Sequence, residues 1–423
     1  MRQPRPGSIG DGAARRRWWA PWIAALAAAA CSSKPAAKAG LVTPVALAAA
    51  PGSALPNLRT AADGSVLLSW TEPAAADGAH ALRWAELGPR GFGSPATVAV
   101  GADWLLNWAD FPSVTRLGPR ALLAHWLRKR PAAGGEGMAG YDIEVARSDD
   151  GGATWSAPWR LHRDDTATEH GFVSVVPRGQ GGALAIWLDG RAFAGLDEAS
   201  AEQHAAMALR ALTIEPPDPA SGSDSASGSD SASGSDPASG SDSASGSDSA
   251  SGSGSGSVPV FVPASGSSSP TDPSLELDPR TCSCCQTAAV ATDDAVLVAY
   301  RDRSADEIRD IAVTRFADGR WSAPVPVHVD GWHIDGCPVN GPALAARGAR
   351  VAVAWYTAAN DQAQVKLALS EDGGRSFGPP VRIDQGSPQG RVDVAMAGEL
   401  SCLGVAMLLM PASLYLLRRK PRP

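Results

Sequence analysis

Acidic, basic and amide side chains form short clusters along the chain that could carry acid–base chemistry or bind an anion. A carboxylate beside an imidazole can move protons, and an arginine can clamp a carboxylate through two parallel hydrogen bonds. We predict acid–base or nucleophilic roles for Glu169, His170, Asp189, Asp302 and Asp310. We predict substrate contacts for Asp110, Arg191, Arg301, Arg303, Asn340 and Arg391.

Cysteines form a second cluster with two possible chemistries. Cys282, Cys284 and Cys285 lie close together in the sequence, and Cys337 follows His333 after four residues. Thiolates and an imidazole could hold Cu or Zn, whereas the same cysteines could instead form one or two disulfides that pin neighbouring loops. The spacing matches no common zinc motif, and the sequence predicts no cofactor apart from this Cu or Zn alternative.

Two nearly identical turns show that the elements carrying these residues are repeats. Segments 148–155 and 370–377 both fit S-x-D-x-G-x-[ST]-[WF], and weaker copies lie at 91–95 and 318–324. Apolar runs that end in an aromatic residue recur every 55 to 61 residues once the tract 217–270 is set aside; they end at Trp70, Trp126, Trp187, Tyr300 and Trp355. Short strands repeated at this period are typical of β-propeller blades.

Five repeats are visible, and a sixth begins at Gly390 but loses the pattern from Ala397. We therefore predict an all-β fold, a six-bladed β-propeller over residues 41–396, with the completeness of the sixth blade left open. The divergent tail 397–423 contains an uncharged run, 400–417, followed by three basic residues. It is either a membrane helix or an aberrant end of the sixth blade.

The S-x-D-x-G-x-[ST]-[WF] turns resemble the Asp-box repeats of the sialidase (neuraminidase) superfamily. That resemblance implies a six-bladed propeller and an exo-acting glycoside hydrolase or glycan-binding protein, with a glycan or small anionic substrate as partner. The chain departs from the family where an Arg-Ile-Pro motif is expected, since 55–60 reads Leu-Pro-Asn-Leu-Arg-Thr, and the sixth repeat has no tyrosine nucleophile. The alternative is a non-catalytic envelope scaffold with a cysteine-based metal or disulfide site.

The N-terminus predicts export. Arg15, Arg16 and Arg17 precede the apolar run 18–30, which is too short to span a membrane permanently. We interpret 1–30 as a signal peptide of the lipoprotein type, with Cys31 as the lipid-bearing residue. The protein would then lie in the cell envelope, periplasm-facing or on the outer membrane, and contact the membrane through its N-terminal lipid.

Charge excludes one class of partner. The formal net charge is −7, but six aspartates lie in the Ser/Asp/Gly tract 217–270, so the remainder is almost neutral. A basic nucleic-acid-binding surface is therefore not expected. We expect the protein to be a monomer. The tract has almost no apolar side chains and is predicted to be a disordered insertion within the propeller.

Overall fold

In the computed structural model the described residues are 42–75, 77–132, 138–197, 206–216 and 272–396, with two further strands at 404–407 and 415–417. The predicted signal peptide, Cys31 and the tract 217–270 lie outside them. The chain divides into two compact units, 46–411 and a second made of 1–45 with 412–423. In the second unit, β1 (Val42–Pro44) pairs antiparallel with β26 (Tyr415–Leu417).

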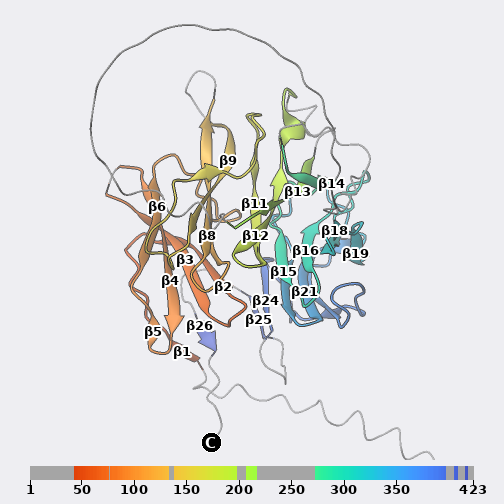
Figure 1. Ribbon diagram of the computed structural model, residues 1–423. Helices are drawn as coiled ribbons and strands as arrows, with labels where there is room; N and C mark the ends of the chain where they lie inside the picture. Colours follow the sequence, from red (N-terminus) through yellow and green to blue (C-terminus); the bar gives the residue numbers. More distant parts are fainter. Residues whose placement is uncertain are drawn as a thin grey trace, which may run out of the picture. The chain divides into compact units, whose positions relative to one another are not determined.

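The larger unit is an all-β propeller whose described residues form five blades, each an antiparallel sheet of four or five strands (Figure 1). The first blade contains β2 (Ala54–Thr60), β3 (Val66–Pro73), β4 (His80–Gly88), β5 (Gly91–Phe92) and β6 (Ala96–Gly101). The second contains β7 (Ser113–Arg116), β8 (Leu122–Pro131), β9 (Met138–Ser148) and β10 (Trp159–Arg160). The third contains β11 (His170–Arg178), β12 (Gly182–Asp189), β13 (Met207–Ile214) and β14 (Leu275–Thr281).

The remaining two blades follow the tract. The fourth contains β15 (Ala288–Ala291), β16 (Val296–Arg301), β17 (Ile311–Ala317), β18 (Arg320–Trp321) and β19 (Val325–His328). The fifth contains β20 (Ala343–Arg347), β21 (Arg350–Thr357), β22 (Gln364–Ser370) and β23 (Val381–Arg382). Two short 3-10 helices, η1 (Arg191–Phe193) and η3 (Ala359–Asp361), lie in loops.

A two-stranded sheet occupies the place of the sixth blade, so the prediction of six blades is wrong for the described residues. It pairs β24 (Val392–Ala395) with β25 (Gly404–Met407). The described parts of the tail are strands β25 and β26, which contradicts the helical interpretation at those positions. Among the described residues, no helix is both long and apolar enough to cross a membrane.

The first strands of successive sheets contact one another in the order β2, β7, β11, β15, β20 and β24. Polar side chains join them where they meet: the Ser113 hydroxyl donates to Asn57 Oδ1 at 2.9 Å, and the hydroxyls of Ser174 and Thr287 lie 2.8 Å apart. Asp393 in β24 lies close enough to the half-buried Arg59 in β2 for their charges to interact. The strand that follows the fifth blade therefore returns to the first.

The Asp-box turns fold locally and pack between blades. Asp150 accepts hydrogen bonds from the Ser148 hydroxyl at 2.8 Å and from the Thr154 backbone N–H at 2.9 Å, and Asp372 repeats this pattern in the fifth blade. Gly152 has a φ of +87° and lies so close to Trp84 of the first blade that a Cβ would collide with its indole ring. The aspartate thus shapes the turn, and the glycine permits the blades to touch.

The neighbouring Gly151 allows the effect of positive φ to be separated from the effect of close packing. It has a φ of +80°, but a Cβ at this residue would meet no atom within 4 Å, so Gly151→Ala should cost only the backbone strain, about 1 kcal/mol. Gly152→Ala should cost a further 1–3 kcal/mol, roughly, because Trp84 must move. Urea unfolding followed by tryptophan fluorescence measures both. Equal losses in the two variants would contradict close packing at Gly152.

Candidate functional site

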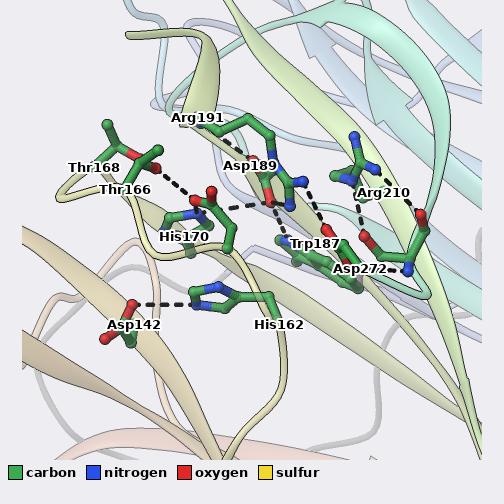
Figure 2. Close-up of polar contacts among 12 residues, drawn as sticks. Asp142, His162, Thr166, Thr168, His170, Trp187, Asp189, Arg191, Arg210 and Asp272 are labelled. Carbon is green, nitrogen blue, oxygen red and sulfur yellow. Dashed lines mark hydrogen bonds and ion pairs between the residues drawn. The ribbon is translucent and has the colours of Figure 1, made fainter. Parts of the chain in front are cut away.

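Three side chains of the third blade form a tightly bonded group at the end of its first two strands (Figure 2). His170 begins β11 and lies opposite Asp189, which ends β12, so the strand register brings the two together. Arg191 donates to both carboxylate oxygens of Asp189, from Nε at 2.6 Å and from Nη2 at 2.8 Å. Trp187 Nε1 donates to Asp189 Oδ2 at 3.0 Å, and the side chain of Asp189 is fully buried.

Asp189 is ionised because its partners outweigh its burial. Burial alone would raise the pKa of this carboxyl, but the hydrogen bonds and charge of Arg191, with the charge of His170, lower it below its usual value. Arg191 also donates from Nη1 to Asp272 Oδ2 at 2.6 Å. The guanidinium of Arg191 is therefore shared by two carboxylates of the protein itself.

Two buried histidines extend this group toward the second blade. The His162 and His170 rings stack in parallel, with centroids 3.9 Å apart and planes 9° apart. His170 Nε2 lies 2.8 Å from Asp164 Oδ2, and His162 Nε2 lies 3.3 Å from Asp142 Oδ1. Burial lowers the pKa of His162, and together His162 and Arg130 overcome the burial of Asp142 and bring the pKa of that carboxyl to about 2.

The histidines and carboxylates form two sets whose ligand atoms lie within 4.8 Å of one another, Asp142 with His162 and His170, and Asp164 with His170 and Asp189. Such donors suit a divalent cation. Arg130 and Arg191 already balance two of these carboxylates, with Arg130 Nε 2.7 Å from Asp142 Oδ2. The arrangement is thus a charge-paired network that fixes both rings.

A second acidic group lies between the second and third blades. Asp110 precedes β7, is buried, and accepts a hydrogen bond from the Phe172 backbone N–H at 2.8 Å. Burial, reinforced by the charge of Glu169, raises the pKa of Asp110 to about 7. Partial removal from water also raises the pKa of Glu169, against the opposing charge of His170 and the hydrogen bond from Tyr141, although its side chain still reaches solvent. This group can hold a proton near neutral pH.

An exposed indole lies next to Asp110. Trp108 is 56% exposed, and the Arg391 guanidinium lies over its ring, 4.4 Å from the centroid. Arg391 also donates to the backbone carbonyls of Trp108 at 2.8 Å and Ala109 at 3.1 Å. Arg391 thereby holds the segment that carries both Trp108 and Asp110.

The predicted site residues of the fourth blade do not join either of these groups but bond to neighbouring parts of the protein. Arg301 is 1% exposed and donates to the backbone carbonyls of Asn340, at 2.8 Å, Tyr356, at 2.7 Å, and Arg309. Burial and the charges of Asp278 and Asp310 raise the pKa of Asp302 to about 6. Arg303 pairs with Glu307, with Nη2 2.8 Å from Oε1. Asp310 accepts hydrogen bonds from the backbone N–H groups of Gly331 and Trp332.

The structure therefore distributes the predicted site residues over separate groups. It brings Glu169, His170, Asp189 and Arg191 together in the third blade and places Asp110 beside Glu169. The guanidiniums of Arg191, Arg301 and Arg391 have different protein partners, so the described contacts do not form one shared anion clamp. Sequence reasoning missed the residues that complete these groups, namely Tyr141, Asp142, His162, Asp164 and Asp272.

The cysteines divide into a bonded pair and a free pair. Cys284 and Cys337 form a disulfide that joins the loop before β15 to the loop before β20. Cys282 and Cys285 are free and buried. His333 is exposed and lies 3.8 Å from Asp335, so the described contacts of its imidazole are not to the sulfurs.

Comparison with known proteins gave similarity to solved structures only. No family model matches the chain, and no curated protein matches it. An α-L-arabinanase of Penicillium chrysogenum complexed with arabinobiose is 12% identical, with a TM-score of 0.41 over 76% of this chain and 77% of that one. A protein of unknown function from Dyadobacter fermentans is 12% identical, with a TM-score of 0.42 over 84% and 92%.

A third similar structure is the GH93 α-L-arabinofuranosidase of Fusarium graminearum with arabinobiose, 10% identical, with a TM-score of 0.39 over 72% of this chain and 71% of that one. At these TM-scores the similarity carries no argument about the site. The fold assignment rests on the sheet topology described above, and membership of the sialidase superfamily stays a prediction.

Removing the guanidinium of Arg191, which lies between Asp189 and Asp272, should destabilise the third blade. Arg191→Met leaves a buried carboxylate without its partner, so the free energy of unfolding should fall by about 3–5 kcal/mol at pH 8 and by less at pH 5, where the carboxyls can take up protons. Arg350→Met removes a partner of Glu371 in an exposed pair and should cost less than about 1 kcal/mol. Urea unfolding at both pH values measures this, and similar losses in the two variants would contradict it.

Asp110 should make stability depend on pH in the opposite direction to a paired carboxylate. Its pKa rises from 3.8 to about 7 on folding, so its contribution is fully present below about pH 4 and is lost as pH rises through 7. Relative to wild type, Asp110→Asn should therefore gain stability between pH 4.5 and 8.5, by roughly 3–4 kcal/mol. The exposed Asp335→Asn should show no such trend. A flat difference between Asp110→Asn and wild type would refute the buried proton.

Proposed function

We propose that this propeller is a glycan-active protein, an exo-acting glycoside hydrolase of the sialidase-like kind. One observation carries the proposal: carboxyl groups from adjacent blades, Asp110 and Glu169, interact and both have raised pKa values, and Asp110 follows the exposed Trp108 by two residues. Glycoside hydrolysis needs a carboxyl that is protonated near neutral pH and a second carboxyl to assist. The face of an indole suits the apolar face of a sugar ring.

In this proposal Glu169 is the group that meets the substrate, because its side chain reaches solvent, and Tyr141 positions it through their hydrogen bond. The charge of Glu169 in turn helps to keep Asp110 protonated beside it. Trp108 orients the sugar, and Arg391 fixes the Trp108 ring. The charge-paired network around His170 and Asp189 supports the loop from which Glu169 projects.

Export, lipidation at Cys31 and a cell-envelope location belong to this proposal as expectations from the sequence. They are supported by the charged and apolar pattern of residues 15–31. They would place a glycan hydrolase where extracellular polysaccharide or glycoprotein is available.

The function can be tested with fluorogenic glycosides, including sialosides and α-L-arabinofuranosides, together with a glycan-binding array. Glu169→Gln and Asp110→Asn should each lower hydrolysis by on the order of 100-fold or more while glycan binding persists. Trp108→Ala should weaken binding by about tenfold through loss of stacking. Trp159→Ala removes an indole that is 37% exposed on strand β10, away from the loop that carries Trp108, and should change neither.

Binding without hydrolysis in the wild-type protein would instead support the non-catalytic scaffold. Neither binding nor hydrolysis would reject the glycan proposal. Equal effects of Trp108→Ala and Trp159→Ala would remove Trp108 from the site.

A further inference from the structure

Four cysteines lie near one another and differ in how far they are buried. Cys337 is exposed and bonded to the half-buried Cys284, whereas Cys282 and Cys285 are 0% and 1% exposed. The Sγ of Cys282 lies 2.6 Å from the Sγ of Cys285 and 3.9 Å from the Sγ of Cys284. A free buried thiol is therefore close to one sulfur of a disulfide whose other sulfur faces solvent.

The surroundings favour a thiolate at Cys282. Its sulfur accepts a hydrogen bond from Cys285, and the positive charges of Arg301 and Arg309 lie nearby. These contacts outweigh the effect of burial and lower the pKa of Cys282 to about 6, while burial raises the pKa of Cys285. Of the two free cysteines, Cys282 is thus the nucleophile.

We propose that Cys282, Cys284, Cys285 and Cys337 form a thiol–disulfide exchange site, in which the buried pair can take over the disulfide of the surface pair. The Cys282 thiolate attacks Cys284 Sγ, the Cys284–Cys337 bond breaks, and Cys337 leaves with the electron pair and takes up a proton. The Cys285 thiolate then attacks Cys282 Sγ, and Cys284 leaves in the same way. Two electrons pass from the buried pair to the outer pair, and no external oxidant is needed.

The exchange would change both reactivity and structure at the surface. It converts an exposed disulfide into an exposed Cys337 thiol, which can react with low-molecular-weight disulfides. It also releases the loop that leads from Cys337 to Asn340. The Asn340 carbonyl accepts from Arg301, and its side-chain oxygen accepts from the Arg391 backbone N–H at 2.7 Å. The covalent link therefore holds a loop that contacts both the fourth blade and Arg391, the residue just before β24.

The test follows alkylation of Cys337 in the folded, non-reduced full chain. Cys31→Ser and Cys402→Ser form the background, so that neither of the other cysteines can react. Iodoacetamide should slowly label Cys337, and peptide mapping by mass spectrometry should then find a Cys282–Cys285 disulfide. Adding Cys282→Ser removes the nucleophile and should slow labelling by on the order of tenfold or more. Adding Cys285→Ser should still expose Cys337 but trap a Cys282–Cys284 disulfide.

The two serine variants are matched, because both replace a buried thiol of the same pair. Labelling of Cys337 at the same rate with and without Cys282 would overturn the proposal. So would the absence of any Cys282–Cys285 linkage in the labelled background protein, a result that does not depend on the folding of any cysteine variant of the buried pair. Far-UV circular dichroism before labelling identifies a variant that has unfolded.

Discussion

Closure of the ring of first strands is the constraint on which the rest of the structure depends. Each blade contacts only its neighbours. The strand after the fifth blade must therefore contact the first blade, or both would have open edges. In this protein β24 supplies that contact: Asp393 interacts with Arg59 in β2, and Arg391 donates to the carbonyls of Trp108 and Ala109. Arg391, which helps to close the ring, therefore also fixes Trp108, the residue proposed to bind the sugar.

Burial of charge explains why the network around Asp189 and His170, although rich in polar side chains, is not the proposed catalytic site. Taking Asp189 out of water is costly, and the cost is offset because Arg191 and Trp187 bond to both of its carboxylate oxygens. A carboxylate bound this fully is not available to a substrate, and the His170 ring beside it is itself buried. Glu169, which adjoins the same network, is exposed and can still meet a substrate, and its charge raises the pKa of the neighbouring Asp110.

The sequence predicts the blades well because each Asp-box turn is specified locally, by Asp150 or Asp372 bonding within a few residues and by a glycine that must be small. The site is predicted only in part. Asp272 meets Arg191 across the tract 217–270, and His162 meets His170 through packing between blades, so neither contact leaves a local signal. The cysteine pairing likewise depends on how two loops approach, which spacing alone cannot decide.

Backbone strain at some of the first strands links β24 to them, although its sheet has only two strands. Leu55 and Phe172 lie within β2 and β11, and Val339 and Arg391 precede β20 and β24; their φ values are 54°, 56°, 52° and 52°. Positive φ is costly for residues other than glycine, so it persists only where surrounding contacts hold it. The Phe172 backbone N–H donates to Asp110, which precedes β7, and the Arg391 backbone N–H donates to Asn340, which precedes β20. In both cases a side chain from the preceding blade holds the strained residue, so β24 is attached to the fifth blade in the way that β11 is attached to the second.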